Sequence, residues 1–178
     1  CALALLIPTR LTPDIEDIRR EHDKAYDRWM PHINFLFPFV QEKKIPDVTG
    51  RLSSELSKLP PFVLNLNEVG SFSQLLNNNV IQTFHLKPKD ETKMIELYAA
   101  VRRAIPEFKP RRNDFHPHLT LGQWKKSENP TTMLQSRFDR GISVVVDKLY
   151  IITRTKDSPF SVHSEIPLGI NVEGGYED

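Results

Sequence analysis

The 178-residue chain has one cysteine, Cys1, and no apolar run that approaches the ~20 residues needed to cross a bilayer. A lone cysteine excludes an internal disulfide framework and a zinc site built from cysteines, and it favours a reducing compartment. The opening apolar run, residues 2–7, is too short for a signal peptide and has no basic residues before it. We therefore expect an intracellular protein, cytoplasmic or nuclear, that does not use a membrane as a partner.

Neither sign of charge is in excess, because 24 Lys and Arg face 23 Asp and Glu and give a formal net charge of +1. This balance excludes a polybasic nucleic-acid coat, so any anion must be bound by a local group of basic residues. The length suits a single domain, which we expect over residues 1–170 as a monomer of two closely packed halves. Residues 171–178 have little to bury and predict a loose acidic tail. Because the chain opens with Cys rather than Met, we also expect it to occur fused to other modules in a longer protein.

The hydrophobic pattern predicts alternating strands and helices. Apolar β-prone runs predict strands at residues 2–7, 32–40, 62–66, 80–86, 115–122, 142–153 (one long or two short) and 160–167. Apolar residues at helical spacing predict helices from Thr12 to Trp29, at 52–59, at 91–105 and at 131–138. Gly70 and residues 77–79 are predicted to lie in a loop, as is Trp124. This order predicts an α+β fold: one theme used twice, in two pseudo-symmetric antiparallel sheet lobes with helices outside and a central cleft.

Two short stretches resemble each other, His32-Ile33-Asn34-Phe35 and His118-Leu119-Thr120-Leu121. In a strand, residues i and i+2 share a face, so each imidazole would project together with a small hydrogen-bonding side chain. The two histidines are 86 residues apart (118 − 32), close to half of the chain. We expect both pairs to meet across one cleft.

Two facing imidazoles can divide the work of an in-line displacement at phosphorus. One accepts a proton from water while the other donates a proton to the departing ribose oxygen. The Asn34 amide and the Thr120 hydroxyl can donate hydrogen bonds to the phosphate oxygens as charge builds there. This scheme requires no metal and no other cofactor.

The paired motifs, with their flanks Pro31-His32-Ile33-Asn34-Phe35-Leu36-Phe37-Pro38-Phe39 and Pro117-His118-Leu119-Thr120-Leu121-Gly122, resemble the H-x-T/S-x motifs of the 2H phosphoesterase superfamily, in its 2'-5' RNA ligase-like and 2',3'-cyclic phosphodiesterase branch. The resemblance covers nearly the whole chain. It implies the bilobal fold, a site made of His32, Asn34, His118 and Thr120, and a metal-independent phosphodiesterase. The implied partner is an RNA end or a nucleotide that carries a cyclic phosphate. Its opening leaves a 2'- or a 3'-phosphate, depending on which oxygen is protonated, and the resemblance favours the 2'-phosphate. Asn34 departs from the family's usual Thr or Ser.

Further residues are candidates for binding the substrate. Arg111 and Arg112 precede His118 and can contact a terminal phosphate or an RNA backbone. Phe37 and Trp124, with Phe72, offer surfaces on which a base can stack. Tyr150 and Arg154 fall on one face of a predicted strand, from which Arg154 can reach phosphate.

Other interpretations remain open at this point. His116 and His118 form an H-x-H pair that would aim two imidazoles at one metal, although no carboxylate or cysteine cluster accompanies them. His22, His85 and His163 have no such context, and structural or exposed positions are expected for them. The departure at Asn34 keeps a second function in view, a binding module that holds a nucleotide or RNA end in the same cleft without turnover.

Overall fold

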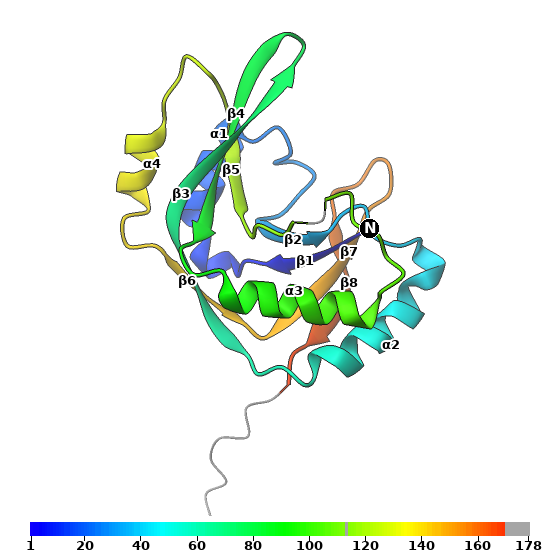
Figure 1. Ribbon diagram of the computed structural model, residues 1–178. Helices are drawn as coiled ribbons and strands as arrows, with labels where there is room; N and C mark the ends of the chain where they lie inside the picture. Colours follow the sequence, from blue (N-terminus) through cyan, green and yellow to red (C-terminus); the bar gives the residue numbers. More distant parts are fainter. Residues whose placement is uncertain (113, 170–178) are drawn as a thin grey trace, which may run out of the picture.

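The computed structural model describes residues 1–112 and 114–169, so the predicted acidic tail lies outside the described residues. Within these ranges, eight strands form a single antiparallel sheet in the order β6-β3-β4-β5-β2-β1-β7-β8 (Figure 1). The strands are β1 (Ala2–Leu6), β2 (His32–Leu36), β3 (Phe62–Leu76), β4 (Asn79–Pro88), β5 (Leu119–Lys125), β6 (Ile142–Val146), β7 (Lys148–Thr153) and β8 (Ser161–Pro167). The α-helices are α1 (Pro13–His22), α2 (Ile45–Leu56), α3 (Thr92–Ala104) and α4 (Thr131–Arg137).

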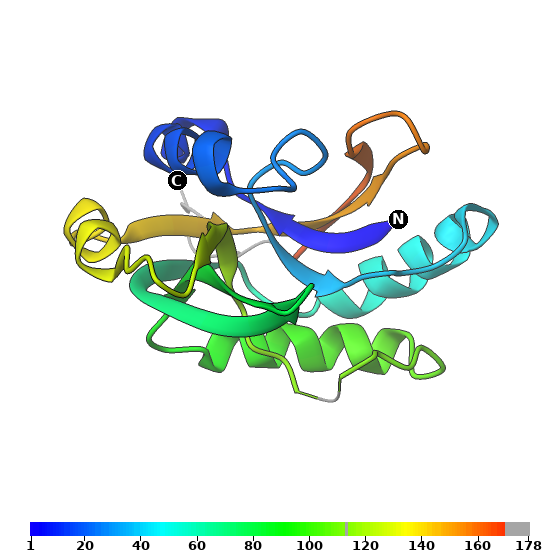
Figure 2. The same cartoon turned by 90° about the horizontal axis from the view of Figure 1, so that it is seen from above.

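The sheet consists of two four-stranded halves that meet at β2 and β5. Strands β6, β3, β4 and β5 make one half, and β2, β1, β7 and β8 make the other. In the described part of the chain, only Ile33 and Leu119 are paired across the seam, whereas β3 and β4 pair along ten positions. The predicted α+β architecture of two similar antiparallel halves is therefore confirmed, with the halves joined into one strongly curved sheet (Figure 2).

The main core lies between the sheet and helices α2 and α3, which run side by side (Figure 1). Ile33, Phe35, Leu119 and Leu121 are at most 6% exposed and face this core. Because side chains alternate along a strand, the side chains between them project from the opposite face of the sheet. The apolar stripes of α2 and α3 cover the first face: Ile45, Val48, Leu52, Leu56, Met94, Leu97, Ala100 and Val101.

The first helix is shorter than predicted. It ends at His22 instead of reaching Trp29, although Trp29 continues the helical spacing of apolar residues. Asp23 adopts an extended backbone conformation, and its carboxylate accepts hydrogen bonds from the Arg19 side chain and from the Ala25 backbone N–H. These side-chain bonds compete with continued helix formation, as Asp often does. Residues 24–28 form turns that carry Trp29 towards the sheet.

The loop predicted around Gly70 is instead part of the long hairpin formed by β3 and β4, which extends beyond the rest of the sheet in Figure 1. Only Asn77 and Asn78 form the turn, both with positive φ (49° and 63°), as a two-residue hairpin turn of type I′ requires. Gly70 lies opposite His85, and a Cβ at this position would be 2.6 Å from the His85 Nε2 atom. The strand therefore needs a glycine here to accommodate the His85 ring.

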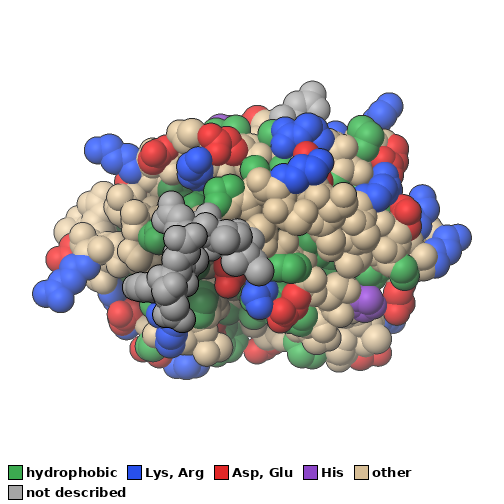
Figure 3. Space-filling model, turned by 90° about the horizontal axis from the view of Figure 1, so that it is seen from below, with side chains coloured by type: hydrophobic (Ala, Val, Ile, Leu, Met, Phe, Trp, Pro, Cys, Tyr) green, Lys and Arg blue, Asp and Glu red, His purple; other side chains and the backbone are tan. Residues whose placement is uncertain are grey.

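The surface carries charges of both signs. In the view of Figure 3, Lys and Arg side chains are interspersed with Asp and Glu rather than gathered by sign. This distribution agrees with the near-zero net charge of the sequence. In the described part of the chain, no helix is both long and apolar enough to span a bilayer.

Candidate functional site

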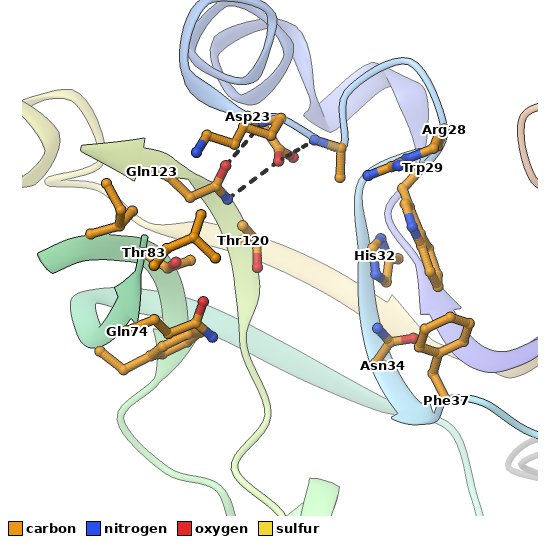
Figure 4. A pocket seen from close by; sticks show the side chains of 15 residues that line it. Asp23, Arg28, Trp29, His32, Asn34, Phe37, Gln74, Thr83, Thr120 and Gln123 are labelled. Atoms are coloured by element: carbon orange, nitrogen blue, oxygen red, sulfur yellow. Dashed lines mark hydrogen bonds between the residues drawn. The ribbon is translucent and has the colours of Figure 1, made fainter. Parts of the chain in front are cut away.

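A cavity of about 410 Å³ opens on the face of the sheet opposite α2 and α3. It lies between the two halves, with β2 and the segment 23–31 on one side and β5 and the β3–β4 hairpin on the other (Figure 4). Its polar lining includes His32, Asn34, Thr120 and Arg28. Three of the predicted site residues, His32, Asn34 and Thr120, therefore share one cavity, together with the predicted stacking residue Phe37.

His32 is the first residue of β2, and two contacts hold its ring. Its Nδ1 atom lies 2.7 Å from the backbone oxygen of Met30, and its ring stacks on Trp29 with centroids 4.4 Å apart and planes at 18°. A carbonyl oxygen can only accept, so Nδ1 carries the proton in this contact. In the neutral ring, the lone pair is then on Nε2.

The surroundings of His32 favour its neutral form. Burial lowers the pKa of His32 from 6.5 to about 4, because a charged imidazolium loses its hydration there. The hydrogen bond to Met30 opposes this shift, and the positive charge of Arg19 adds to it. His32 is therefore an unprotonated base throughout the neutral pH range.

His118 repeats the backbone contact of His32. It lies one residue before β5, not within a strand as predicted, and its Nδ1 is 2.8 Å from the backbone oxygen of His116. In both halves, the imidazole thus donates to the carbonyl two residues earlier, which leaves Nε2 free of this contact. The correspondence reflects the similar sequences Pro-His-Ile-Asn and Pro-His-Leu-Thr.

A second cavity of about 640 Å³ adjoins the first. Asn34 and Phe37 line both cavities, while His118 lines the second. The second cavity also brings in Arg111 and Arg112, with Lys109 and Asp114 as further charged groups. The lining thus contains three positive side chains and one negative side chain, so this cavity suits an anionic group.

His85, which had no recognisable context in the sequence, lies beside His118. Its ring centroid is 5.0 Å from that of His118, and Phe72 is 5.5 Å from His85 and 5.6 Å from His118. Pairing of β4 with β5 sets His85 opposite Thr120, on the face that carries the cavity. Burial and the neighbouring His118 lower the pKa of His85 to about 4, so His85 is also neutral near pH 7. Its Nδ1 is buried and has no hydrogen-bond partner within residues 1–112 and 114–169.

Asn34 lies where the two cavities meet, because it lines both of them. Its Oδ1 atom is buried, and none of the residues that the structure describes provides it with a hydrogen-bond partner. A buried amide oxygen without a partner costs about 1 to 3 kcal/mol, so the position is not explained by stability. The amide group is available to a ligand at the junction.

Three predicted substrate-binding residues line neither cavity. Trp124 is in β5, not in a loop, and is 6% exposed, stacked on His22 at 4.4 Å. Tyr150 packs in a small apolar cluster with Ala2, Ala4, Ile152 and Phe160, where burial raises its pKa. Arg154 donates hydrogen bonds to the backbone oxygens of Thr155 and Lys156 in its own loop. Trp124 and Tyr150 therefore pack against apolar residues, and Arg154 holds the conformation of its own loop.

The H-x-H pair does not aim both rings at one point. The exposed His116 ring lies 3.3 Å from the Asp114 carboxylate and 3.8 Å from that of Glu91, while the Nδ1 of His118 contacts the His116 backbone. Across residues 1–112 and 114–169, no group of three or more His, Cys, Asp or Glu side chains is arranged to hold a metal ion.

The residues that sequence reasoning missed come mainly from segment 23–31. Helical spacing predicts a helix at Trp29, and no sequence pattern points to Arg28 or Gln123, yet all three line the first cavity. A signal was present in the order Trp29-Met30-Pro31-His32, because a proline one residue before His32 ends any helix and starts an extended segment. An aromatic residue in such a connector is free to cover the strand that follows.

Sequence comparison places this arrangement among known proteins. The sequence pattern of the 2'-5' RNA ligase superfamily matches residues 7–158. A protein of Bacillus anthracis named "Putative phosphoesterase" is 26% identical over 171 residues, which cover 93% of this chain and 95% of that protein. A Bacillus cereus protein of the same description is 25% identical over the same length.

Solved structures share the fold. Escherichia coli LigT in complex with 3'-AMP aligns with a TM-score of 0.60 at 19% identity, over 94% of this chain and 96% of that one. TT0787 of Thermus thermophilus aligns with a TM-score of 0.63 at 16% identity, over 96% and 98%. Kluyveromyces marxianus Usb1 with uridine monophosphate gives 0.53 at 13% identity, over 94% and 97%. At these identities, the likeness concerns the fold.

Proposed function

The chain belongs to the 2'-5' RNA ligase superfamily, and on this premise we propose that it is a metal-independent phosphodiesterase that opens 2',3'-cyclic phosphates on RNA ends or nucleotides, or cleaves 2'-5' linkages. The observation that carries the proposal is the matched pair of imidazoles. His32 and His118 each donate Nδ1–H to the backbone carbonyl two residues earlier, so each presents Nε2 for proton transfer. Two such groups are what a concerted acid–base reaction at phosphorus needs.

The two imidazoles differ in their surroundings, which supports a division of roles. His32, with its pKa lowered to about 4 under Trp29, acts as the general base that takes a proton from water through Nε2. The water oxygen forms a bond to phosphorus, and the bond from phosphorus to one ribose oxygen breaks. His118 donates its Nε2 proton to that departing oxygen, and the product is a phosphate monoester.

The polar groups around the imidazoles suit an anionic ester. The Thr120 hydroxyl and the Asn34 amide can donate to non-bridging oxygens, and Arg28 adds positive charge at the first cavity. Arg111 and Arg112 in the second cavity provide charge-assisted contacts for a further phosphate of a nucleotide or RNA end. Phe37, which is 51% exposed and lines both cavities, offers a face for a base.

The nucleotide class is supported by the fold relatives. LigT was solved with 3'-AMP and Usb1 with uridine monophosphate, so proteins of this fold accommodate nucleotides. A binding module without turnover is the second candidate, and Asn34 is the observation that favours it. The amide replaces the usual hydroxyl of the resembled motif at the junction of the two cavities.

Turnover of a mononucleotide 2',3'-cyclic phosphate and of a short RNA with a cyclic end, both with a chelator present, tests the proposal. We expect hydrolysis by the parent and a loss of about 10² to 10⁴ in rate for His32→Gln and for His118→Gln. His163→Gln is the matched control, because His163 is exposed and lines neither cavity. Tight binding of both ligands with no turnover by the parent would favour the binding module instead.

A further inference from the structure

Arg19 is the most deeply buried charged side chain among the residues that the structure describes, at 2% exposure. It extends from α1 to three acceptors: the Asp23 carboxylate (Nε to Oδ2, 2.9 Å), the Glu16 carboxylate (3.2 Å) and the Trp29 backbone oxygen (Nη2, 2.7 Å). Burying a guanidinium is costly unless its donors are paired, so this geometry is strongly defined. The contact with Trp29 joins the helix to a segment ten residues further along the chain.

The segment 23–31 supplies both groups that hold His32. The Trp29 indole covers one face of the imidazole, and the next residue, Met30, provides the carbonyl that accepts from Nδ1. Arg19 binds the carbonyl of Trp29, which lies between these two groups along the backbone. Any movement of this carbonyl would therefore displace both contacts of His32.

The same segment is connected to the other half of the sheet. Asp23, the partner of Arg19, lies 3.4 Å from the Gln123 amide nitrogen, and the backbone N–H of Lys24 donates to the Gln123 side-chain oxygen at 3.0 Å (Figure 4). Gln123 belongs to β5, the strand that begins directly after His118. The network that starts at Arg19 thus reaches both strands that carry the proposed site.

We propose that Arg19, together with Asp23, is a positioning residue that fixes segment 23–31 so that Trp29 covers His32 and Met30 orients its ring. The proposal rests on the proposed function, because it explains how His32 is kept neutral and correctly oriented as the base. Arg19 itself lines neither cavity and does not touch the reacting atoms. It acts through the segment.

The loss of a charge near His32 and the displacement of segment 23–31 change the pKa of His32 in different ways, so variants of Arg19 and Asp23 can distinguish the two effects. The charged and titratable groups that act on His32 are Arg19 on α1, Asp23 in the segment and His118 before β5, while burial is the largest influence. Arg19→Lys keeps the positive charge but cannot bind three acceptors with a planar fork. Asp23→Asn removes a negative charge that raises the pKa of His32, so loss of charge alone would lower that pKa.

The measurement is the pKa of His32 from NMR titration of its ring protons in the full chain, with His32→Gln to assign the signal. If the segment loosens and water reaches the ring, burial is relieved and the pKa of His32 rises by about one unit or more in both Arg19→Lys and Asp23→Asn. Arg103→Lys is the matched control, since Arg103 is a 59% exposed arginine on α3 that pairs with Glu55 on α2. It should leave the pKa unchanged.

An unchanged or lowered pKa of His32 in Asp23→Asn would overturn the proposal, because only charge would then act. A variant that unfolds where the parent stays folded would also overturn it, since the pair would then support the fold as a whole. The titration does not depend on turnover, so it tests the proposal even if the protein hydrolyses no substrate. If the parent is active, we also expect kcat to fall at least tenfold in Arg19→Lys, and the acid limb of its pH profile to move upwards.

Discussion

Two imidazoles with lowered pKa values, His32 and His85, should make the folded state sensitive to mild acid. Burial lowers the pKa of each from 6.5 to about 4. Between these values, the unfolded chain binds a proton at each position while the folded chain does not. Because stability rises with pH wherever the unfolded state binds more protons, lowering the pH through this window destabilises the fold.

The size of the effect follows from the pKa values. Between pH 7 and pH 5, a histidine that titrates at 6.5 unfolded and at about 4 folded loses ~2 kcal/mol of stability. Both imidazoles together should therefore cost ~4 kcal/mol, a large part of the ~5 to 15 kcal/mol typical of a folded domain. The loss should be complete near pH 4, where the folded state begins to bind protons as well.

Urea unfolding of the parent at pH 7 and at pH 5 measures the loss directly. His32→Gln and His85→Gln should each remove about half of the pH dependence, and the double variant should remove nearly all of it. The exposed His163 provides the control, His163→Gln, which should keep the full dependence of the parent. A double variant that loses as much stability as the parent between pH 7 and pH 5 would refute the reasoning, because other groups would then be responsible.

Three further outcomes are expected. Asn34→Ala should lower turnover of a cyclic-phosphate RNA by ten- to a hundredfold, the worth of one hydrogen bond to an anion. Asn34→Thr should keep the turnover within about tenfold of the parent. Equal rates for all three proteins would show that Asn34 does not contact the reacting phosphate. The rate should follow a bell-shaped pH profile whose acid limb lies below 6.5, since His32 must be neutral, and a profile without an acid limb in stopped-time assays would contradict its role as base. Gly70→Ala should lower the free energy of unfolding in urea by about 1 to 3 kcal/mol, because the new Cβ would be 2.6 Å from the His85 ring. The control Gly50→Ala, in open space on α2, should leave that free energy unchanged or raise it. Equal effects of the two variants would contradict the packing of His85.

The sequence alone predicted the features that depend on local periodicity. Alternation in β2 predicted that His32 and Asn34 would share a face away from Ile33 and Phe35, and the structure has these apolar residues buried in the core. Helical spacing likewise predicted the inner face of α3 and, in α2, the buried residues Leu52 and Leu56, although α2 begins at Ile45 and ends at Leu56. The duplicated motif predicted two similar halves, because similar local patterns favour similar local structure.

Long-range contacts decided what periodicity could not reach. Trp29 continues a helical stripe, yet the bonds of Asp23 to Arg19 and Ala25 end α1 early and send Trp29 to His32. Neither bond can be deduced from spacing, because Asp23 has the same i+4 position to Arg19 in a continuous helix. The competition between helix and turn was resolved by the tertiary contacts of Trp29, whose ring packs against His32 and Phe160.

The neighbourhood of His118 was decided in the same way. The pairing of β4 with β5 places His85 beside His118. This pairing includes a register shift between Phe84 and His85, which no local sequence pattern predicts. Trp124 is buried in the core, and Arg154 donates hydrogen bonds to backbone oxygens of its own loop. The sequence by itself thus determined which side chains share a strand face, and the tertiary structure decided which faces meet, because strand pairing and burial depend on partners far apart in the chain.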